Sequence, residues 1–423
     1  MSSISTQRRD AGRIIEMCPY SERAYAAGRE FLAGIDAILP RLAARAGEAE
    51  ELGRVPDASI EDMRAAGMYR ALAPRDRGGL EIDPASFMDA VMRIGGACPS
   101  SAWVGAFFGV HAWQIALLPA AMQDEFWAPG PDIRAASSYS PTGKVTSVPG
   151  GFRLDGTWAF CSGIDHADWI ILGGVVTDDG EGAEFRSFVV PRSDFAILPD
   201  SWNVAGLKGS GSKAIRLDGV FVPEHRTHRV SDAQQGTDPG LAINPGALYR
   251  VPWLTIFYSA ISSTAVGAAL GGIDWFIEDA KTRISPLSGQ PAAANPFLHV
   301  RIANALSSAE AMRDRSLSRW RELFDTLCRG EGLSRIERTK TRFEFADVTA
   351  NSYLALSEVY ETAGGGAIAA SKPLQRIFRD LMAMRNHPTA TREVFASVFT
   401  QALLDLPPPP FDKSSMGSLA FHA

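Results

Sequence analysis

The spacing of hydrophobic residues changes twice along the chain and divides it into three parts. From about residue 15 to about 130, alanine- and leucine-rich segments with helical spacing predict helices, one interrupted at Pro40 and another starting with Asp57 as its cap. From about 131 to 235, short β-prone runs are separated by Gly, Asp and Pro. From about 245 onward, helical spacing returns. The pattern indicates an α+β fold that is mostly α.

The middle part is predicted to form a small antiparallel sandwich or barrel. Its expected strands are Gly151–Leu154, Trp169–Leu172, Phe185–Val190, Ala214–Leu217 and Val220–Val222. The predicted order of elements is helices, then a β-module, then long helices. This order differs from that of a doubly wound sheet, in which strands and helices alternate. The glycine-rich segment 206–212 matches neither the Walker pattern nor the dinucleotide fingerprint, which disfavours a nicotinamide-binding Rossmann site.

One apolar segment, 251–273, has no charged residue and is long enough to raise the question of a membrane span. It contains Pro252, several serines and threonines, and the pair Gly271-Gly272. Small residues of this kind let neighbouring helices approach closely. We therefore expect a helix buried inside a bundle, and no membrane partner.

The overall composition is that of a globular protein, with 46% hydrophobic and 21% charged residues among 423. The net charge of -6 provides no basic surface for nucleic acid. The four cysteines are scattered without CxxC spacing, so neither a metal site nor a disulfide framework is expected. The first 13 residues lack the apolar core of a secretory signal. These features predict a cytoplasmic protein.

Several short motifs occur along the chain in an order typical of one family. They are Arg54-Val55-Pro56-Asp57, Gly78-Gly79-Leu80-Glu81, Phe160-Cys161-Ser162-Gly163-Ile164-Asp165-His166-Ala167, Gly209-Ser210-Gly211-Ser212-Lys213, Val222-Pro223-Glu224 and Leu374-Gln375-Arg376-Ile377-Phe378-Arg379-Asp380. From roughly residue 30 to 405 the chain resembles flavin-dependent monooxygenases built on the acyl-CoA dehydrogenase fold. These are the oxygenase components of two-component systems, such as 4-hydroxyphenylacetate 3-hydroxylase and related phenol and aromatic-polyketide hydroxylases.

The resemblance implies a three-part architecture. It comprises an N-terminal helical domain (1–130), a middle antiparallel β-domain (131–235) and a C-terminal four-helix bundle (236–423) that carries the flavin site and the contacts of a homotetramer. A separate NAD(P)H:flavin reductase would supply reduced flavin, FMN rather than FAD in our expectation. With O2 the enzyme would hydroxylate a phenolic or polycyclic aromatic substrate through a flavin C4a-hydroperoxide.

The resemblance also implies three catalytic residues. Acyl-CoA dehydrogenases carry a glutamate base shortly after an Arg-Asp pair, whereas this chain has Asn386-His387-Pro388-Thr389 there. His387 is expected to take or hold the phenolic proton, with His111 assisting, because imidazole changes its charge near neutral pH. Ser162 is expected beside flavin N5. Alternatives stay open: a helix-capping role for His387, a core role for His111 and a turn-forming role for Ser162.

Further residues are assigned through the same resemblance, each beside a structural alternative. The expected flavin-binding residues are Ser138, Tyr139, Trp202, Ser210, Ser212, Arg250 and Arg376, besides Ser162. The expected substrate-binding residues are Trp103, Phe107, Phe108, His111 and Thr389. Core packing is the alternative for the aromatic residues, and solvent exposure or ion pairing for the charged ones. Asp165 and His166 are interpreted as structural, and the segment 230–244 as a lid. Lys213 could reach the flavin phosphate, with a solvated charge as the alternative.

Three rival functions are consistent with the same residues. A heteroatom oxygenase acting on sulfur or nitrogen would need no base, because such atoms are already nucleophilic. A true acyl-CoA dehydrogenase would hold FAD tightly and use a base from another helix. A non-catalytic flavin carrier would bind flavin without forming product. The position of His387, where the dehydrogenases have their acid, favours the aromatic oxygenase.

Overall fold

The computed structural model describes residues 18–178, 182–284 and 289–407. The N-terminal segment examined for a secretory signal, and most of the proline run after residue 406, lie outside these ranges. The helices are α1 (Pro19–Asp36), α2 (Leu39–Ala44), α3 (Ala46–Leu52), α4 (Asp57–Ala65), α5 (Pro84–Ala97), α6 (Pro99–Ile115), α7 (Ala120–Trp127), α8 (Val230–Gln235), α9 (Trp253–Thr282), α10 (Pro296–Cys328), α11 (Arg335–Tyr360), α12 (Pro373–Arg385) and α13 (Arg392–Leu403). The mostly helical class is confirmed.

The strands form two four-stranded sheets. They are β1 (Ala135–Ser138), β2 (Lys144–Val148), β3 (Gly151–Trp158), β4 (Trp169–Asp178), β5 (Gly182–Pro191), β6 (Ala196–Leu198), β7 (Ala214–Pro223) and β8 (Thr227–Arg229). One sheet has the order β1-β4-β5-β8 and the other β2-β3-β7-β6. The expected β-module is therefore present in the middle of the chain.

Two details of the β-module differ from the prediction. β1 pairs with β4 in parallel, with Ala135 opposite Trp169, so the module is not purely antiparallel. β1 and β4 can be parallel because β2 and β3, which belong to the other sheet, provide the crossover between them. The two predicted runs around 214 and 222 are one strand, β7, which continues through Gly219 in a left-handed conformation (φ 59°).

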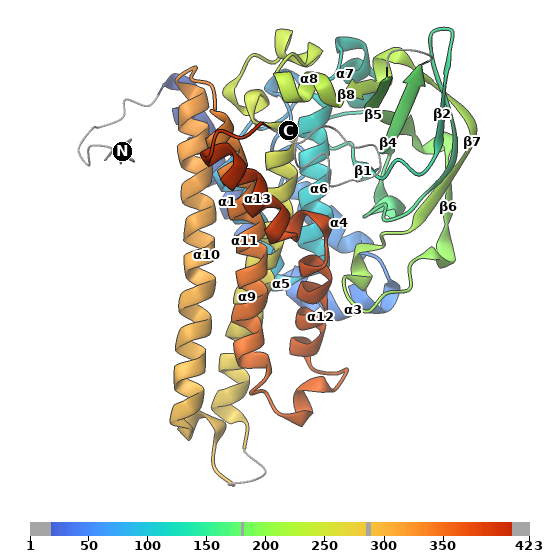
Figure 1. Ribbon diagram of the computed structural model, residues 1–423. Helices are drawn as coiled ribbons and strands as arrows, with labels where there is room; N and C mark the ends of the chain where they lie inside the picture. The colour runs from blue at the N-terminus through green and yellow to red at the C-terminus, as the bar shows by residue number, and fades with distance from the viewer. Residues whose placement is uncertain (1–17, 179–181, 285–288, 408–423) are drawn as a thin grey trace, which may run out of the picture.

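The long helices pack beside one another and α6 lies between them and the strands (Figure 1). The apolar segment forms α9, and 89% of its most apolar window is buried inside the molecule. α9 packs closely against α5, where Gly267 of α9 meets Gly95 of α5. A Cβ on Gly267 would lie 2.1 Å from the Met92 carbonyl oxygen. Close helix approach thus explains the small residues. The domain boundaries at 130 and 235 stay a prediction.

The predicted cap of α4 is wrong in its detail. Pro56 occupies the N-cap position and no side chain caps the helix. The carboxylate of Asp57 pairs with Arg54 instead, at 2.8 Å. A cap needs the acid one residue before the first helical residue, whereas Pro56, with an extended ψ of 144°, occupies that position and Asp57 is the first residue of the helix.

The loop between β6 and β7 is locked against α12. A Cβ on Gly206 would lie 2.0 Å from the Arg379 carbonyl oxygen, and the next residue, Leu207, donates its N–H to Asp380 at 2.6 Å. We expect Gly206→Ala to lower the free energy of unfolding by roughly 1–3 kcal/mol, because the helix backbone must move. Urea unfolding measures this. Gly332→Ala, whose Cβ would meet nothing within 4 Å, is the control, and equal midpoints would contradict the contact.

Candidate active site

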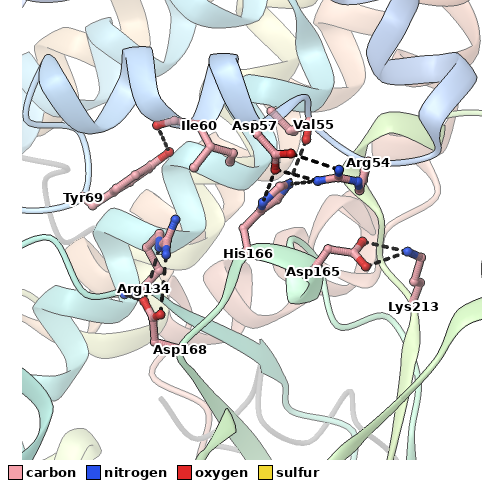
Figure 2. Close-up of polar contacts among 10 residues, drawn as sticks. All are labelled: Arg54, Val55, Asp57, Ile60, Tyr69, Arg134, Asp165, His166, Asp168 and Lys213. Atoms are coloured by element: carbon pink, nitrogen blue, oxygen red, sulfur yellow. Dashed lines mark hydrogen bonds and ion pairs between the residues drawn. The ribbon is translucent and has the colours of Figure 1, made fainter.

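The turn that carries Ser162 is anchored to the segment between α3 and α4 and to the residue before β7. His166 donates Nε2–H to the Val55 carbonyl oxygen (2.8 Å), and Asp165 forms a 2.6 Å ion pair with Lys213 (Figure 2). Asp165 and His166 therefore have the expected structural contacts. The solvated-charge alternative for Lys213 is wrong, because Asp165 holds it in a half-buried ion pair. These contacts fix the position of Ser162.

A chain of hydroxyl groups starts at Ser162. The indole N–H of Trp103 donates to Ser162 Oγ at 2.9 Å. Ser162 Oγ lies 2.8 Å from Ser212 Oγ, which lies 2.7 Å from Ser210 Oγ. Because Trp103 already donates to Ser162, the Ser162 hydroxyl hydrogen is available for Ser212 or for a ligand.

Phe160, two residues before Ser162, has a strained and exposed position. Its φ is 61°, a left-handed value that is costly for an aromatic residue, and its side chain is 69% exposed. The ring of Trp202 stands edge-on to it, with centroids 6.0 Å apart. Strain of this kind beside Ser162 indicates that the turn serves a site rather than stability alone.

A continuous row of rings leads from His387 into the molecule along α6. The Trp103 ring lies 5.8 Å from that of His387 and 5.1 Å from that of Phe107, which stacks on His111 at 5.8 Å. Further rings surround the inner end. We call the set the aromatic row; its members are His387, Trp103, Phe107, His111, Phe257, Tyr139 and Trp253. The structure thus joins Ser162 and both predicted catalytic histidines through Trp103 and Phe107.

His111 presents a hydrogen-bond acceptor inside this row. Its Nδ1 lies 2.5 Å from the carbonyl oxygen of Ala135, which can only accept, so Nδ1 carries the hydrogen. Nε2 therefore carries the lone pair, and it has no partner among the residues that the structure describes. Burial lowers the pKa of His111 to about 4, which keeps the ring neutral at pH 7.

His387 has the opposite hydrogen-bonding polarity. It sits in extended backbone just after α12, as the following proline predicts. Its Nδ1 accepts the backbone N–H of Thr389 at 3.3 Å and lies 2.9 Å from the Thr389 hydroxyl. Nε2 therefore carries the hydrogen and can donate it. Burial lowers the pKa of His387 to about 4 as well.

Both lowered histidine pKa values predict a stability change at mildly acidic pH. The unfolded chain binds protons near pH 6.5 and the folded chain only near pH 4, so stability is complete above pH 6.5 and falls as the pH drops towards 4. For the fully buried His111 the loss is about 3 kcal/mol. In His111→Phe this part of the slope should vanish in urea titrations at several pH values. The exposed His299→Gln serves as control, and an unchanged slope in His111→Phe would contradict the assignment.

Three other predicted site residues lie outside the aromatic row. Ser138 donates to the Ala159 carbonyl oxygen (2.7 Å) and so points away from the row. Phe108 packs edge-on against Tyr69 and beside Gly163, so it supports the Ser162 turn rather than a substrate wall. Arg376 is half-buried, and its Nε has no partner among the described side chains.

Arg250 does not join the group around Ser162. It is exposed at the end of a short 3-10 helix and lines a pocket of about 270 Å³ together with Arg338, Arg342 and Trp253 of the aromatic row. Among the described residues it has no contact with the Ser162 hydroxyl chain. Its predicted place against a flavin ring is therefore unsupported by this arrangement.

The structure adds residues that the sequence analysis missed. Ser137, in β1, has its side chain beside that of Tyr139, the first residue after the strand. Gln114, three residues after His111 on α6, accepts a hydrogen bond from Tyr139 Oη at 2.5 Å. The two-residue period of a strand and the three-residue spacing of a helix could have indicated both. No local signal could have indicated Phe257, which comes from α9.

Comparison with known proteins shows what this chain is similar to. Residues 259–392 match the family model described as acyl-CoA dehydrogenase, C-terminal domain. Over 361 residues the chain is 38% identical to the flavin-dependent monooxygenase, oxygenase subunit HsaA, of Rhodococcus jostii (strain RHA1), covering 84% of this chain and 92% of that protein.

Two further relatives are similar over most of their length. The p-hydroxyphenylacetate 3-hydroxylase, oxygenase component, of Acinetobacter baumannii is 32% identical over 391 residues, covering 90% of this chain and 91% of the relative. The crystal structure of 3-HSA hydroxylase from Rhodococcus sp. RHA1 superimposes with a TM-score of 0.85 at 35% identity, covering 90% of this chain and 98% of that chain.

Proposed function

Because the chain belongs to the oxygenase components of flavin-dependent aromatic monooxygenases with the acyl-CoA dehydrogenase fold, we propose that it hydroxylates a phenolic or polycyclic aromatic compound with reduced flavin and O2, its two active-site histidines acting in opposite senses. One observation carries the division of roles. His111 presents a lone pair and His387 presents an N–H at the two ends of the Trp103–Phe107 pair. An acceptor and a donor so placed suit a reaction that removes a proton at one end and supports a transferring oxygen at the other.

The residues around Ser162 fit a flavin. The Ser162 hydroxyl can hydrogen-bond its polar edge, and the exposed ring of Phe160 with Trp202 beside it offers an aromatic face. Ser210 and Ser212 extend the hydroxyl groups along the same edge. Reduced flavin, when bound there, supplies the activated oxygen taken from O2. The enclosing side chains of the aromatic row exclude water from the reacting atoms.

In this proposal His111 is the base. Its Nε2 lone pair receives the hydrogen bond of the phenol, which raises the electron density of the ring. An imidazole with a pKa near 4 is a weak base, but the hydroxyl of a ring under attack by electrophilic oxygen becomes a strong acid. The proton therefore moves to Nε2 as the new carbon–oxygen bond forms. The Ala135 carbonyl holds the imidazolium that results.

His387 takes the role of donor rather than base. The Thr389 backbone occupies its Nδ1, so only Nε2–H faces the neighbouring groups. Held edge-on to Trp103, this N–H can hydrogen-bond the flavin or the oxygen being transferred. This arrangement supports the reverse of the roles we predicted from sequence, in which His387 removed the proton and His111 assisted.

Cofactor choice, partners and assembly are the finer parts of the proposal. The flavin is FMN, whose single phosphate needs a smaller polar site than the dinucleotide of FAD, and a separate NAD(P)H:flavin reductase in the cytoplasm supplies it. A homotetramer is supported by large apolar side chains exposed on the long helices, among them Phe297 (80%), Val300 (59%) and Leu354 (57%). Burial between subunits would remove these apolar side chains from water.

Isotopically heavy dioxygen tests the function. Protein, reduced FMN, a flavin reductase and a panel of phenols and naphthols are incubated under the labelled gas. One labelled oxygen atom in a ring hydroxyl of the product is expected. Labelled sulfoxide or N-oxide from heteroatom analogues, with phenols left unchanged, would instead support the heteroatom oxygenase. Flavin binding without any product would support a carrier protein.

A further inference from the structure

A buried chain of hydrogen bonds links the inner end of the aromatic row to the segment 230–244. Tyr139 Oη donates to Gln114 Oε1 at 2.5 Å, Gln114 Nε2 lies 3.3 Å from His228 Nδ1, and His228 Nε2 lies 2.6 Å from Asp238 Oδ1. Gln114 and His228 are at most 1% exposed and Asp238 is 7% exposed. The four side chains come from the residue after β1, from α6, from β8 and from the loop after α8, so tertiary packing alone brings them together.

The direction of every bond in this chain follows from Asp238. A carboxylate only accepts, so His228 carries its hydrogen on Nε2 and presents a lone pair at Nδ1. Gln114 then turns its NH2 group to His228 and its oxygen to Tyr139. Tyr139 must donate to that oxygen. An amide in the middle passes on orientation but not a proton, so the chain orients Tyr139 and does not conduct protons.

Tyr139 lies at the inner end of the aromatic row. Its ring contacts those of His111 (6.4 Å), Phe257 (5.4 Å) and Trp253 (5.3 Å). With its hydrogen committed to Gln114, its oxygen presents only lone pairs to any other neighbour. The Ser137 hydroxyl lies beside that of Tyr139. If Ser137 donates its hydrogen to Tyr139, its own oxygen is left to accept a hydrogen bond from a ligand.

We propose that the chain from Asp238 to Tyr139 is a specificity device: it holds Tyr139, like His111 Nε2, as a hydrogen-bond acceptor at the inner end of the substrate site. This inference rests on the proposed function and narrows its substrate class. His111 Nε2 receives the phenol hydrogen, and Tyr139, directly or through Ser137, receives a second one. The preferred substrate is therefore an aromatic compound that carries a second hydroxyl or amino group besides the phenol, rather than an ether or carbonyl at that position.

Replacing one carboxylate oxygen of Asp238 with an amide NH2 group is expected to reverse the direction of the hydrogen bonds in this chain. In Asp238→Asn the amide can donate to His228 Nε2, which moves the histidine hydrogen to Nδ1, flips Gln114 and leaves Tyr139 to donate towards the substrate. The test compares the binding of a naphthalenediol and of its monomethyl ether to the protein with reduced FMN, without oxygen, by calorimetry. The wild-type protein is expected to prefer the diol by roughly tenfold, and Asp238→Asn to lose or reverse this preference.

Two further variants separate orientation from general damage. Tyr139→Phe should abolish the preference, and adding Asp238→Asn to it should change the ratio no further. Glu125→Gln is the matched control, because Glu125 holds His225 in a similar 2.6 Å contact that leads to none of the aromatic row. Histidine nitrogen resonances of labelled protein report the tautomer directly: hydrogen on Nε2 of His228 in the wild-type protein and on Nδ1 in Asp238→Asn.

The possible outcomes are distinguishable. If the wild-type protein hydroxylates the probes but binds diol and ether equally, or if Asp238→Asn keeps the wild-type ratio, the specificity device is refuted while the oxygenase function stands. A doubly protonated His228 in the wild-type protein would also refute it. If no phenol binds and none is hydroxylated, the proposed function itself fails and the device with it.

Discussion

His111→Asn is expected to lower the rate of hydroxylation by about 10²–10⁴-fold. Asparagine can keep an N–H on the Ala135 carbonyl oxygen, where His111 Nδ1 now donates, but it has no atom in the place of Nε2. The phenol then loses the only acceptor that takes its proton. Oxygen consumption should continue, since the Ser162 side of the site is intact, and most of the oxygen should appear as hydrogen peroxide. Product and peroxide are measured together in single turnovers.

The same experiment separates His111 from His387. His387→Asn should reduce the yield of product less steeply, because a donor supports the reaction without removing the proton. His225→Gln, an imidazole bound to Glu125 away from the aromatic row, is the control. If His387→Asn stops hydroxylation while His111→Asn leaves it near the wild-type rate, the division of roles is wrong and the interpretation from sequence is restored.

Ser162→Ala is expected to release hydrogen peroxide roughly 5- to 150-fold faster, corresponding to about 1–3 kcal/mol for a buried polar group left without its partner. The substitution deprives the flavin edge of a hydroxyl and leaves the indole N–H of Trp103 without its present acceptor. Product yield per flavin should fall in proportion. Rapid mixing of the reduced complex with oxygen, followed by peroxide assay, gives the rate.

The exposed Ser193→Ala in the same β-module is the control for this measurement. A different distribution of effects would be informative. Should Ser212→Ala cause the larger peroxide release and Ser162→Ala almost none, the flavin edge would lie further along the hydroxyl chain than proposed. Equal rates in wild-type protein and Ser162→Ala would remove Ser162 from the flavin site.

Much of the architecture was predictable because it depends on local patterning. Helical spacing in the C-terminal part and short β-prone runs in the middle each report which face of an element is buried. The parallel pairing of β1 with β4 was not predictable, since β1 is short and its partner lies beyond two strands of the other sheet. The joined strand β7 was missed because Asp218-Gly219 has the composition of a turn.

The residues of the candidate site also fall into those placed by local sequence and those placed by tertiary packing. Pro388 placed His387 in extended backbone at the end of α12, and the Ser162 motif marked a turn between strands; both are local effects. Phe108 and Arg250 were assigned by position in the chain; Phe108 packs against Tyr69, whereas the assignment of Arg250, which lines a pocket with Trp253, stays a prediction. Gln114, His228 and Asp238 have no motif, because the hydrogen bonds that unite them cross more than 100 residues between Gln114 and His228.

The amino-acid order alone established that two imidazoles and one serine hydroxyl are available to an oxygenase scaffold whose acid has been lost. It also determined the tautomer of His387, since the partner of Nδ1 is only two residues away. The tautomer of His111 depends on a carbonyl 24 residues away, and the orientation of Tyr139 depends on Asp238 in a distant loop. Folding decided these features, because the direction of a hydrogen bond is set by whichever group lies opposite in space.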